Sequence, residues 1–262
     1  MAPQIIKNIA KALGYVQIAQ FLQDIFRTRF ATDMYLAKLN IVTKTHEKTF
    51  GEYKNKYNGQ EIAIIATGPS LNNYKPIPNV INIGVNKAIF YEKVKLDYYF
   101  AQDYSATKSY LKTLQTNNNI VQFYGIIPMH PFGYKRTNYS GSIIPESYIL
   151  ANNAKKYYLY TKSPAKDFGF ESDIDKTWIV DTGSVVHSAM QFALFTNPKR
   201  IYLVGCDCSS GYFDGTKGSD CRILIDSWKE LKRFADIYYP ETEIISVNPV
   251  GLKGLFTDLY QE

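Results

Sequence analysis

The sequence predicts an α/β protein: a Rossmann-like domain whose mostly parallel sheet has helices on both faces, with an N-terminal helical segment in front of it. From Glu61 onward, short runs rich in β-branched residues are separated by helical or loop segments, which is typical of a parallel sheet. Several of these runs do not alternate apolar and polar residues, as expected of strands buried on both faces. A chain of 262 residues that is 45% hydrophobic can bury one large core of this kind.

The chain is expected to divide into an N-terminal helical segment, residues 1–58, and a Rossmann-like domain, residues 59–262. Apolar residues recur at helical spacing from Ile5 to Val16, and a second stripe runs from Ile18 to Ile25. A polar, Lys-rich helix is predicted over Asp33–Tyr57. The amphipathic face needs a partner, which is the core, a second copy in a homo-oligomer, or the inner face of a membrane.

Seven strands are expected, with an irregular insertion at about residues 125–176 that is rich in Tyr, Pro and Lys. This insertion is either a lid that binds an acceptor or a long irregular excursion. The predicted strands are Ile62–Ala66, Val80–Gly84, Tyr98–Ala101, Ile120–Tyr124, Trp178–Val180, Ile201–Val204 and Ile244–Val247.

Composition and charge narrow the class of partner. The net charge of +6 is spread along the chain without a basic run, so the sequence predicts no nucleic-acid partner, and a small anionic ligand or an anionic membrane surface fits better.

Cys206, Cys208 and Cys221 lack the spacing of a zinc site, and their odd number favours a reducing cytoplasm. Lys7 and Lys11 interrupt the first apolar stretch, so neither a signal peptide nor a spanning helix is expected. The predicted location is cytoplasmic, either soluble or peripheral to the inner membrane.

Polar and small residues follow the predicted strands at the points where the strands end. In an open parallel sheet these positions lie along one edge, the carboxyl edge, where such folds bind ligands. The residues concerned are Thr67, Gly68, Pro69 and Ser70; Asn86; Gln102 and Asp103; Asp181, Thr182, Gly183 and Ser184; Gly205, Cys206 and Asp207; and Asn248 and Pro249.

The turn Thr67-Gly68-Pro69-Ser70 has the chemistry of an anion site at a helix start. Gly68 allows close backbone approach, Pro69 is tolerated in a first helical turn, and Ser70 can bond a phosphate or cap the helix. Free amides there attract anions. The turn matches neither the dinucleotide-binding GxGxxG pattern nor a P-loop, and by itself it equally fits an ordinary strand-to-helix turn.

A second helix start follows Asp181. Thr182, Gly183 and Ser184 present hydroxyls and amides, and His187 lies one turn inside the helix. His187 is either a hydrogen-bonding residue behind the site or a catalyst. The buried face of this helix is predicted from Val186, Ala189, Met190, Ala193 and Leu194.

The two aspartates at strand ends have several possible roles. Asp103 and Asp207 can bond ribose hydroxyls or a cytosine amino group, hold magnesium on a pyrophosphate, or cap the turns that follow them. The Gly-rich loop Ser209–Asp220 either closes over phosphates through Tyr212 or Lys217, or is a disordered turn.

Of the other two histidines, His46 is expected at the surface. His130 is a weaker candidate for a site residue and lies in the insertion.

Four blocks of the sequence resemble the MptE-like and Maf family of bacterial proteins, whose members are glycosyltransferases of flagellin or surface glycans, or pterin pyrophosphokinases. The blocks are YKNKYNGQEIAIIATGPSLN, VNKAIFYEKVKLDYYFAQD, TGSVVHSAMQFALF and IYLVGCD, between Tyr53 and about Pro249. The same blocks are similar, more distantly, to the sialyltransferases of glycosyltransferase family 42, which bind CMP-sialic acid on a Rossmann-like domain without a metal.

The resemblance to family 42 implies a donor pocket. Gly68, Pro69 and Ser70 would surround the nucleotide, with Thr67 where the family has Asn, and Asn86 would lie near the phosphate. Thr182, Gly183 and Ser184 would match the family's Thr-Ser-Gly, and Gly205 and Asp207 would lie near the cytidine or its ribose.

Two departures weigh against sialyl transfer itself. The family places a catalytic His in a lid where Ser209–Arg222 contains none, and Val180 and Asp181 replace the family's Arg before Thr-Ser-Gly.

The leading expectation is a glycosyltransferase of bacterial surface glycans, such as lipooligosaccharide or capsule, with a nucleotide-sugar donor and a glycan or glycolipid acceptor. A CMP-nonulosonic acid is the favoured donor, no metal is required, and the candidate bases are His187, Asp103 and Asp207. The alternatives are an MptE-like pyrophosphokinase using ATP and magnesium, and a nucleotide-binding protein without catalysis.

Overall fold

The computed structural model describes residues 40–103, 109–110, 113–114, 119–126, 146–161, 169–218 and 220–261. The chain forms two compact units, Met1–Ile41 and Val42–Glu262, and the second unit contains the whole sheet. The apolar stripes predicted between Ile5 and Ile25, and His130, lie outside the described residues.

The second unit is built on a nine-stranded sheet in the order β6-β5-β4-β3-β2-β1-β7-β8-β9. Every neighbouring pair is parallel, so the prediction of a mostly parallel sheet is confirmed. The strands are β1 (Glu61–Ile65), β2 (Ile81–Val85), β3 (Tyr98–Ala101), β4 (Val121–Ile126), β5 (Lys155–Thr161), β6 (Ile179–Asp181), β7 (Arg200–Val204), β8 (Glu243–Val247) and β9 (Thr257–Leu259).

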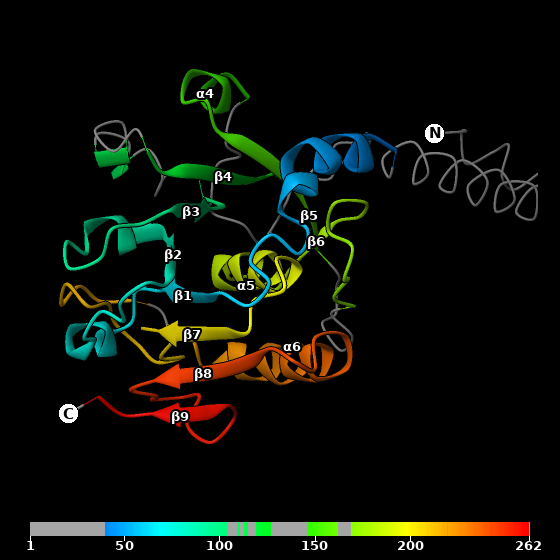
Figure 1. Ribbon diagram of the computed structural model, residues 1–262. Coiled ribbons are helices and arrows are strands. Elements are labelled where there is room, and N and C mark those ends of the chain that lie inside the picture. Colours follow the sequence, from blue (N-terminus) through cyan, green and yellow to red (C-terminus); the bar gives the residue numbers. More distant parts are fainter. Residues whose placement is uncertain are drawn as a thin grey trace, which may run out of the picture. The chain divides into compact units, whose positions relative to one another are not determined.

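The strand order reverses between β1 and β7. From β1 the chain adds strands outward to β6, then returns to place β7 against the free side of β1 and continues to β9. In Figure 1 the arrowheads of β7, β8 and β9 point toward the side of the loop that follows β7, which is drawn in yellow to orange. The β1/β7 junction is therefore a topological switch point, the usual ligand position in an open α/β sheet.

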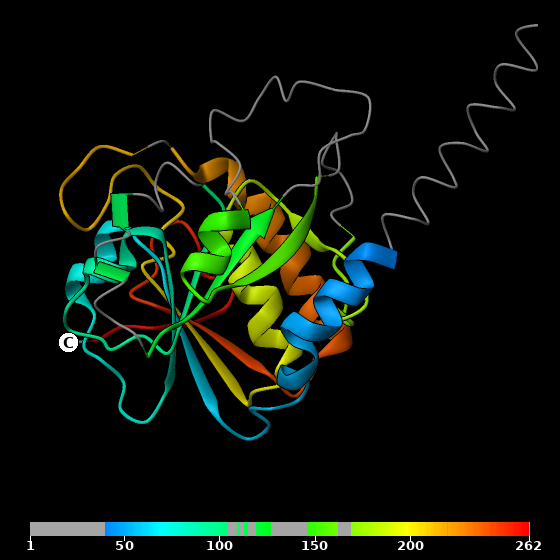
Figure 2. The same cartoon turned by 90° about the horizontal axis from the view of Figure 1, so that it is seen from above.

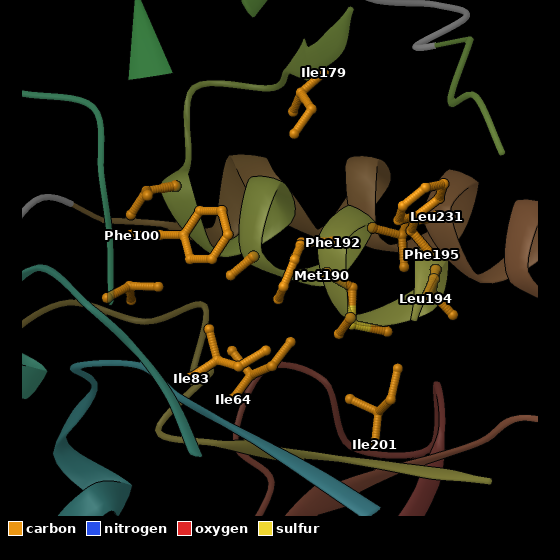
Figure 3. Packing of buried hydrophobic residues seen from close by; sticks show 14 of the residues in the cluster. Ile64, Ile83, Phe100, Ile179, Met190, Phe192, Leu194, Phe195, Ile201 and Leu231 are labelled. Atoms are coloured by element: carbon orange, nitrogen blue, oxygen red, sulfur yellow. The ribbon is translucent and has the colours of Figure 1, made fainter. Parts of the chain in front are cut away.

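One face of the sheet is covered by α5 (Val185–Phe195) and α6 (Ile225–Tyr238), which lie side by side in Figure 2. Figure 3 shows Ile64, Ile83 and Ile201 of the strands near Met190 and Phe192 of α5. All five side chains are fully buried in one cluster. The apolar stripe predicted for residues 186–194 is largely confirmed, although Val186 is only partly buried.

The opposite face carries shorter helices. These are the 3-10 helices η2 (Pro69–Asn73) and η3 (Asn86–Phe90), and the short helix α4 (Glu146–Ala151). Leu71, Ala88 and Tyr148 from these helices share a second core cluster with strand residues such as Tyr99. Helices therefore cover both faces, as the sequence predicts.

The residues before β1 belong to this core. Residues 42–50 are helical and lead into η1 (Gly51–Tyr53). The rings of Phe50 and Tyr53 pack on Phe192 of α5, with ring centroids 6.0 and 5.1 Å apart. The expectation that His46 lies at the surface is wrong: its Nδ1 lies 2.7 Å from the Ile174 carbonyl oxygen, and its Nε2 accepts the Tyr158 N–H at 2.8 Å. His46 thus supplies polar contacts that join this helix to β5 and to the segment before β6.

All seven predicted strands are present, with ends within two residues of those predicted. Two further strands, β5 and β9, were not predicted. β5 lies in the segment interpreted as an irregular insertion, because its sequence KKYYLYT begins with two lysines; β9 has only three residues. None of the helices in the described part of the chain combines the length and hydropathy that crossing a bilayer requires.

Candidate functional site

The turns that follow β1 and β7 remain joined beyond the ends of the two strands. The Ala66 N–H donates to the Val204 carbonyl at 2.8 Å, and the Gly68 N–H donates to the Gly205 carbonyl at 2.8 Å. Gly205 has a φ of +66°, a left-handed conformation that favours glycine. The switch point is thus a rigid double turn that includes three of the residues predicted for the site: Thr67, Gly68 and Gly205.

A glycine is needed at position 68 for a packing reason that sequence reasoning did not identify. A Cβ atom there would lie 2.5 Å from Cγ of Asp207 and 2.7 Å from the Gly205 carbonyl oxygen. The space above Gly68 is therefore filled by Asp207, whereas the sequence suggested that a ligand approaches the backbone there.

Asp207 occupies the anion position at the start of η2. One carboxylate oxygen accepts the Ser70 N–H at 2.8 Å and the other accepts the Ser70 hydroxyl, and the residue is only 5% exposed. This arrangement corrects two expectations: the Ser70 amide is not free for a phosphate, and Asp207 is not placed as a base for a soluble acceptor. Asp207 caps the start of η2, whereas the sequence suggested a cap of the turn that follows it.

Magnesium, which the pyrophosphokinase alternative implies, fits poorly at Asp207. Both carboxylate oxygens already accept hydrogen bonds, so a cation there would have to compete with Ser70. Among the residues that the structure describes, no three His, Cys, Asp or Glu side chains are grouped as metal ligands.

The second predicted turn, Thr182-Gly183-Ser184, leads into α5. The Gly183 N–H donates to Oδ1 of Asp181 at 2.9 Å, and Gly183 has a φ of +84°. Ser184 is the N-cap residue, yet its side chain makes no capping hydrogen bond. The start of α5 therefore lacks a side-chain cap and can offer its first amides to an anion.

His187 lies directly behind this turn. Its Nδ1 shares a hydrogen bond with the Thr182 hydroxyl, and its ring lies 4.4 Å from that of Trp228, centroid to centroid. The side chain is fully buried, and burial lowers its pKa from 6.5 to about 3. Burial and the lowered pKa keep the imidazole neutral, which favours a hydrogen-bonding role behind the site over that of a base.

The carboxyl end of β3 is tied to α5. Nε2 of Gln102 donates to the Ser188 hydroxyl at 2.6 Å. Asp103, the next residue, is partly buried. Of the three candidate bases, Asp103 is the only one that the structure leaves partly exposed at this edge.

Asn86 follows β2 and begins η3. It has a φ of +48°, a left-handed conformation that asparagine tolerates better than most residues. Its position between the ends of β1 and β3 is compatible with the predicted contact to a phosphate.

The loop after β7 is docked against the ends of β1 and β2. The Phe213 N–H donates to the Thr67 carbonyl at 3.0 Å, and Nδ2 of Asn72 donates to the Phe213 carbonyl at 2.8 Å. Nζ of Lys87 lies 2.9 Å from an Asp214 carboxylate oxygen and 4.4 Å from the centroid of the Tyr212 ring. The alternative of a disordered turn is therefore wrong for the described part of this loop.

Lys87 and Asn72 are residues that sequence reasoning missed. Lys87 directly follows Asn86 at a strand end, so its place at the carboxyl edge could have been predicted from the sequence. Its contact with Asp214 could not, because that residue lies 127 residues further along the chain.

The candidate site thus consists of two clusters. The first is the switch-point cluster of Thr67, Gly68, Pro69, Ser70, Gly205 and Asp207; the second is the α5 cluster of Asp103, Thr182, Gly183, Ser184 and His187. The second cluster is linked to β3 through Gln102 and Ser188. Asp103 follows β3, which only β2 separates from β1, whereas Thr182, Gly183 and Ser184 follow β6, five strands from β1.

Solved structures similar to the chain include two glycosyltransferases. One is a MAf glycosyltransferase from Magnetospirillum magneticum AMB-1, with a TM-score of 0.45 and 12% identity over 84% of this chain and 38% of that one. The other is the sialyltransferase CstII from Campylobacter jejuni in complex with a substrate analogue, CMP-3FNeuAc, with a TM-score of 0.42 and 15% identity over 76% of this chain and 85% of that one.

The chain therefore spans well under half the length of the MAf glycosyltransferase. No protein-family model and no curated protein matches it. The two structures are of the kinds that the sequence resemblance names.

Proposed function

We propose that this chain is a glycosyltransferase of bacterial surface glycan synthesis that uses a nucleotide-activated sugar, with a CMP-nonulosonic acid as the favoured donor. The observation that carries the proposal is the pair of clusters at the carboxyl edge, one at the β1/β7 switch point and one at the uncapped start of α5. In this proposal a nucleotide lies along the carboxyl edge with its base at one cluster and its phosphate at the other.

The phosphate of the donor is assigned to the α5 cluster. The Ser70 amide is occupied by Asp207, whereas the first amides of α5 have no side-chain cap. Helix amides and the Thr182 hydroxyl would stabilise the negative charge that develops on the leaving phosphate. His187 would keep the Thr182 hydroxyl in place, which makes it a positioning residue.

Deprotonation of the acceptor hydroxyl is assigned to Asp103. Its carboxylate follows β3, next to Gln102, whose side chain is bonded to α5. A general base must come within hydrogen-bond reach of the proton that it removes, and this edge position allows it better than the buried His187 or Asp207. The acceptor would be a glycan or glycolipid at the cytoplasmic side of the inner membrane.

The first experiment is a thermal-shift screen of the full chain with CMP, CDP, UDP, GDP and ATP, each with and without magnesium. A ligand that binds only the folded state raises the melting temperature, by an amount equivalent to about 2.7 kcal/mol at 100 times Kd. Stabilisation by CMP without magnesium is expected. Stabilisation by ATP only with magnesium would favour the pyrophosphokinase, and no stabilisation by any nucleotide would contradict the proposal. Turnover of a CMP-sugar then separates an enzyme from a nucleotide-binding protein without catalysis.

Thr182→Val tests the assigned role of the α5 cluster. Valine keeps the shape of the side chain but removes the hydroxyl, so the CMP-induced shift should fall and turnover should drop by about 10- to 100-fold. Thr182→Ser retains the hydroxyl and should restore much of both. Thr257→Val, at an exposed position of β9, is the matched control and should leave both unchanged.

A further inference from the structure

A cavity of about 540 Å³ opens beside the C-terminal end of η2, where the turn after β8 meets the last residues of the chain. None of the residues of the switch-point or α5 clusters lines it. Its volume falls in the range of sites that hold small molecules. The residues used below are Asn73, Lys75, Lys93, Asn248, Tyr260 and Gln261, all of which line it.

Two amide side chains fix the wall of this cavity. The Gln261 side chain accepts the Lys75 N–H and donates to the Lys75 carbonyl, both at 2.8 Å. Asn248 accepts the Gln261 N–H at 2.9 Å and donates to the Asn73 carbonyl at 3.3 Å. These bonds hold the C-terminal residues against the end of η2, so the backbone that carries Lys75 has a defined position.

The lining residues of the cavity carry a net positive charge, although an Asp258 carboxylate oxygen lies 3.5 Å from the Tyr260 hydroxyl. No Asp or Glu is among its lining residues, and within the described part of the chain neither Lys75 nor Lys93 forms an ion pair. Nζ of Lys93 lies 5.9 Å from the ring centroid of Tyr91, its nearest recorded partner. Two ammonium groups outweigh the one neighbouring carboxylate, and this net positive charge favours an anionic ligand.

The other lining groups suit a sugar. Tyr260 is 56% exposed, so one ring face can cover the apolar side of a pyranose. The Asn73 side chain is exposed and can bond hydroxyl groups in both donor and acceptor directions. The cavity is also close to the switch-point cluster, because Asn73 is three residues after Ser70 in η2, a rise of about 6 Å.

We propose that this cavity binds a carboxylate-bearing saccharide, the acidic part of the acceptor glycan. Lys75 and Lys93 bind the carboxylate, and Asn73 and Tyr260 contact the ring. The assignment of this saccharide as the acceptor rests on the glycosyltransferase function proposed above. The wall formed by Asn248 and Gln261 fixes the backbone of Lys75 relative to η2, whose other end carries the switch-point cluster.

The test is a titration of the full chain, followed by NMR, with a uronic-acid disaccharide and with its neutral counterpart in which the carboxyl is reduced to a hydroxymethyl group. The acidic sugar should bind about tenfold more tightly than the neutral one. In the double variant Lys75→Gln, Lys93→Gln this preference should disappear. Lys253→Gln, an exposed lysine outside the cavity, should keep it.

Equal binding of the two sugars, or displacement of the acidic sugar by an equal concentration of inorganic phosphate, would overturn the inference, and so would an equal loss in Lys253→Gln. The nucleotide thermal shift of the double variant is measured in parallel and should match that of the unchanged protein. If no nucleotide stabilises either protein, the proposed function fails. If nucleotides bind but the saccharide preference is absent, only the cavity assignment fails.

Discussion

At the residue scale, the switch point already contains its own anion. The Asp207 carboxylate accepts the Ser70 N–H and hydroxyl at the position where the sequence predicts a phosphate. Gly68 provides the space in which that carboxylate lies. A ligand phosphate would meet an occupied amide and a negative charge there, which is why the phosphate is assigned to the start of α5.

Gly68→Ala should destabilise the protein. The new methyl group would collide with the Asp207 carboxyl and with the backbone oxygen of Gly205, so the two turns would have to separate. Such overpacking typically costs about 1–3 kcal/mol. Gly51→Ala is the matched control, because a Cβ there meets nothing within 4 Å. Urea unfolding of both variants checks this, and equal stabilities would show that the double turn yields without cost.

Sequence reasoning located the strand ends better than the contacts of the residues that follow them. The small and hydroxyl residues after β1 and β6 do lie at the carboxyl edge, because strand ends can be read from local sequence. Whether Asp207 is a base or a cap depends on Ser70, which is 137 residues away. The burial of His46 likewise depends on Ile174, 128 residues away. Contacts across such distances leave no periodic signal in one sequence.

At the element scale, Lys87 of η3 holds the loop after β7 in place. Lys87 contacts Asp214 and Thr216 and lies over the Tyr212 ring. The Thr216 hydroxyl and then the Lys87 ammonium group lower the pKa of Asp214 to about 2, so this carboxylate stays charged over the physiological range. A loop held by exposed and half-exposed groups can open at little cost, as a substrate lid must.

Lys87→Met should loosen this loop and leave the rest of the fold intact. The lost ion pair is partly exposed, so we expect the free energy of unfolding to change by no more than about 1 kcal/mol. Amide exchange in residues 209–218 should become faster, most clearly at Phe213, whose N–H bonds the Thr67 carbonyl. Lys95→Met, at an exposed position, should leave the loop unchanged. Unaltered exchange in Lys87→Met would mean that backbone bonds alone hold the loop.

The accuracy of the strand predictions follows how continuously apolar each strand sequence is. Central strands such as β1, with sequence EIAII, are continuous apolar runs, and their ends were predicted within two residues. β5, with sequence KKYYLYT, joins lysines to tyrosines near the edge of the sheet, and only its pairing with β4 and β6 identifies it as a strand. β5 is not at the edge, and its Tyr157 and Leu159 are buried, so its local signal is weak because lysines and tyrosines make up most of its sequence.

At the scale of the whole molecule, the sheet lies between two apolar layers that also contain buried imidazoles and carboxylates. His46 and His187 are the titratable imidazoles of the described core, and both are fully buried. Burial lowers their pKa values from 6.5 to about 4 and about 3, respectively. Folding therefore favours the neutral form of each ring.

Stability should decline on mild acidification. Below pH 6.5 the unfolded chain binds protons at both histidines while the folded chain does not, down to pH values near 4 and 3. The stabilisation is complete above pH 6.5 and is lost as the pH falls, by about 2 kcal/mol for each histidine at pH 5. Most carboxylates still carry their charge at pH 5, which separates this effect from general acid unfolding.

Urea unfolding between pH 7.5 and 5 measures the loss, and in His187→Gln the unfolding free energy should fall with pH at about half the slope. NMR signals of His46 and His187, assigned separately from that of His130, that titrate near pH 6.5 in the folded protein would contradict this prediction, because both rings would then have to be open to solvent.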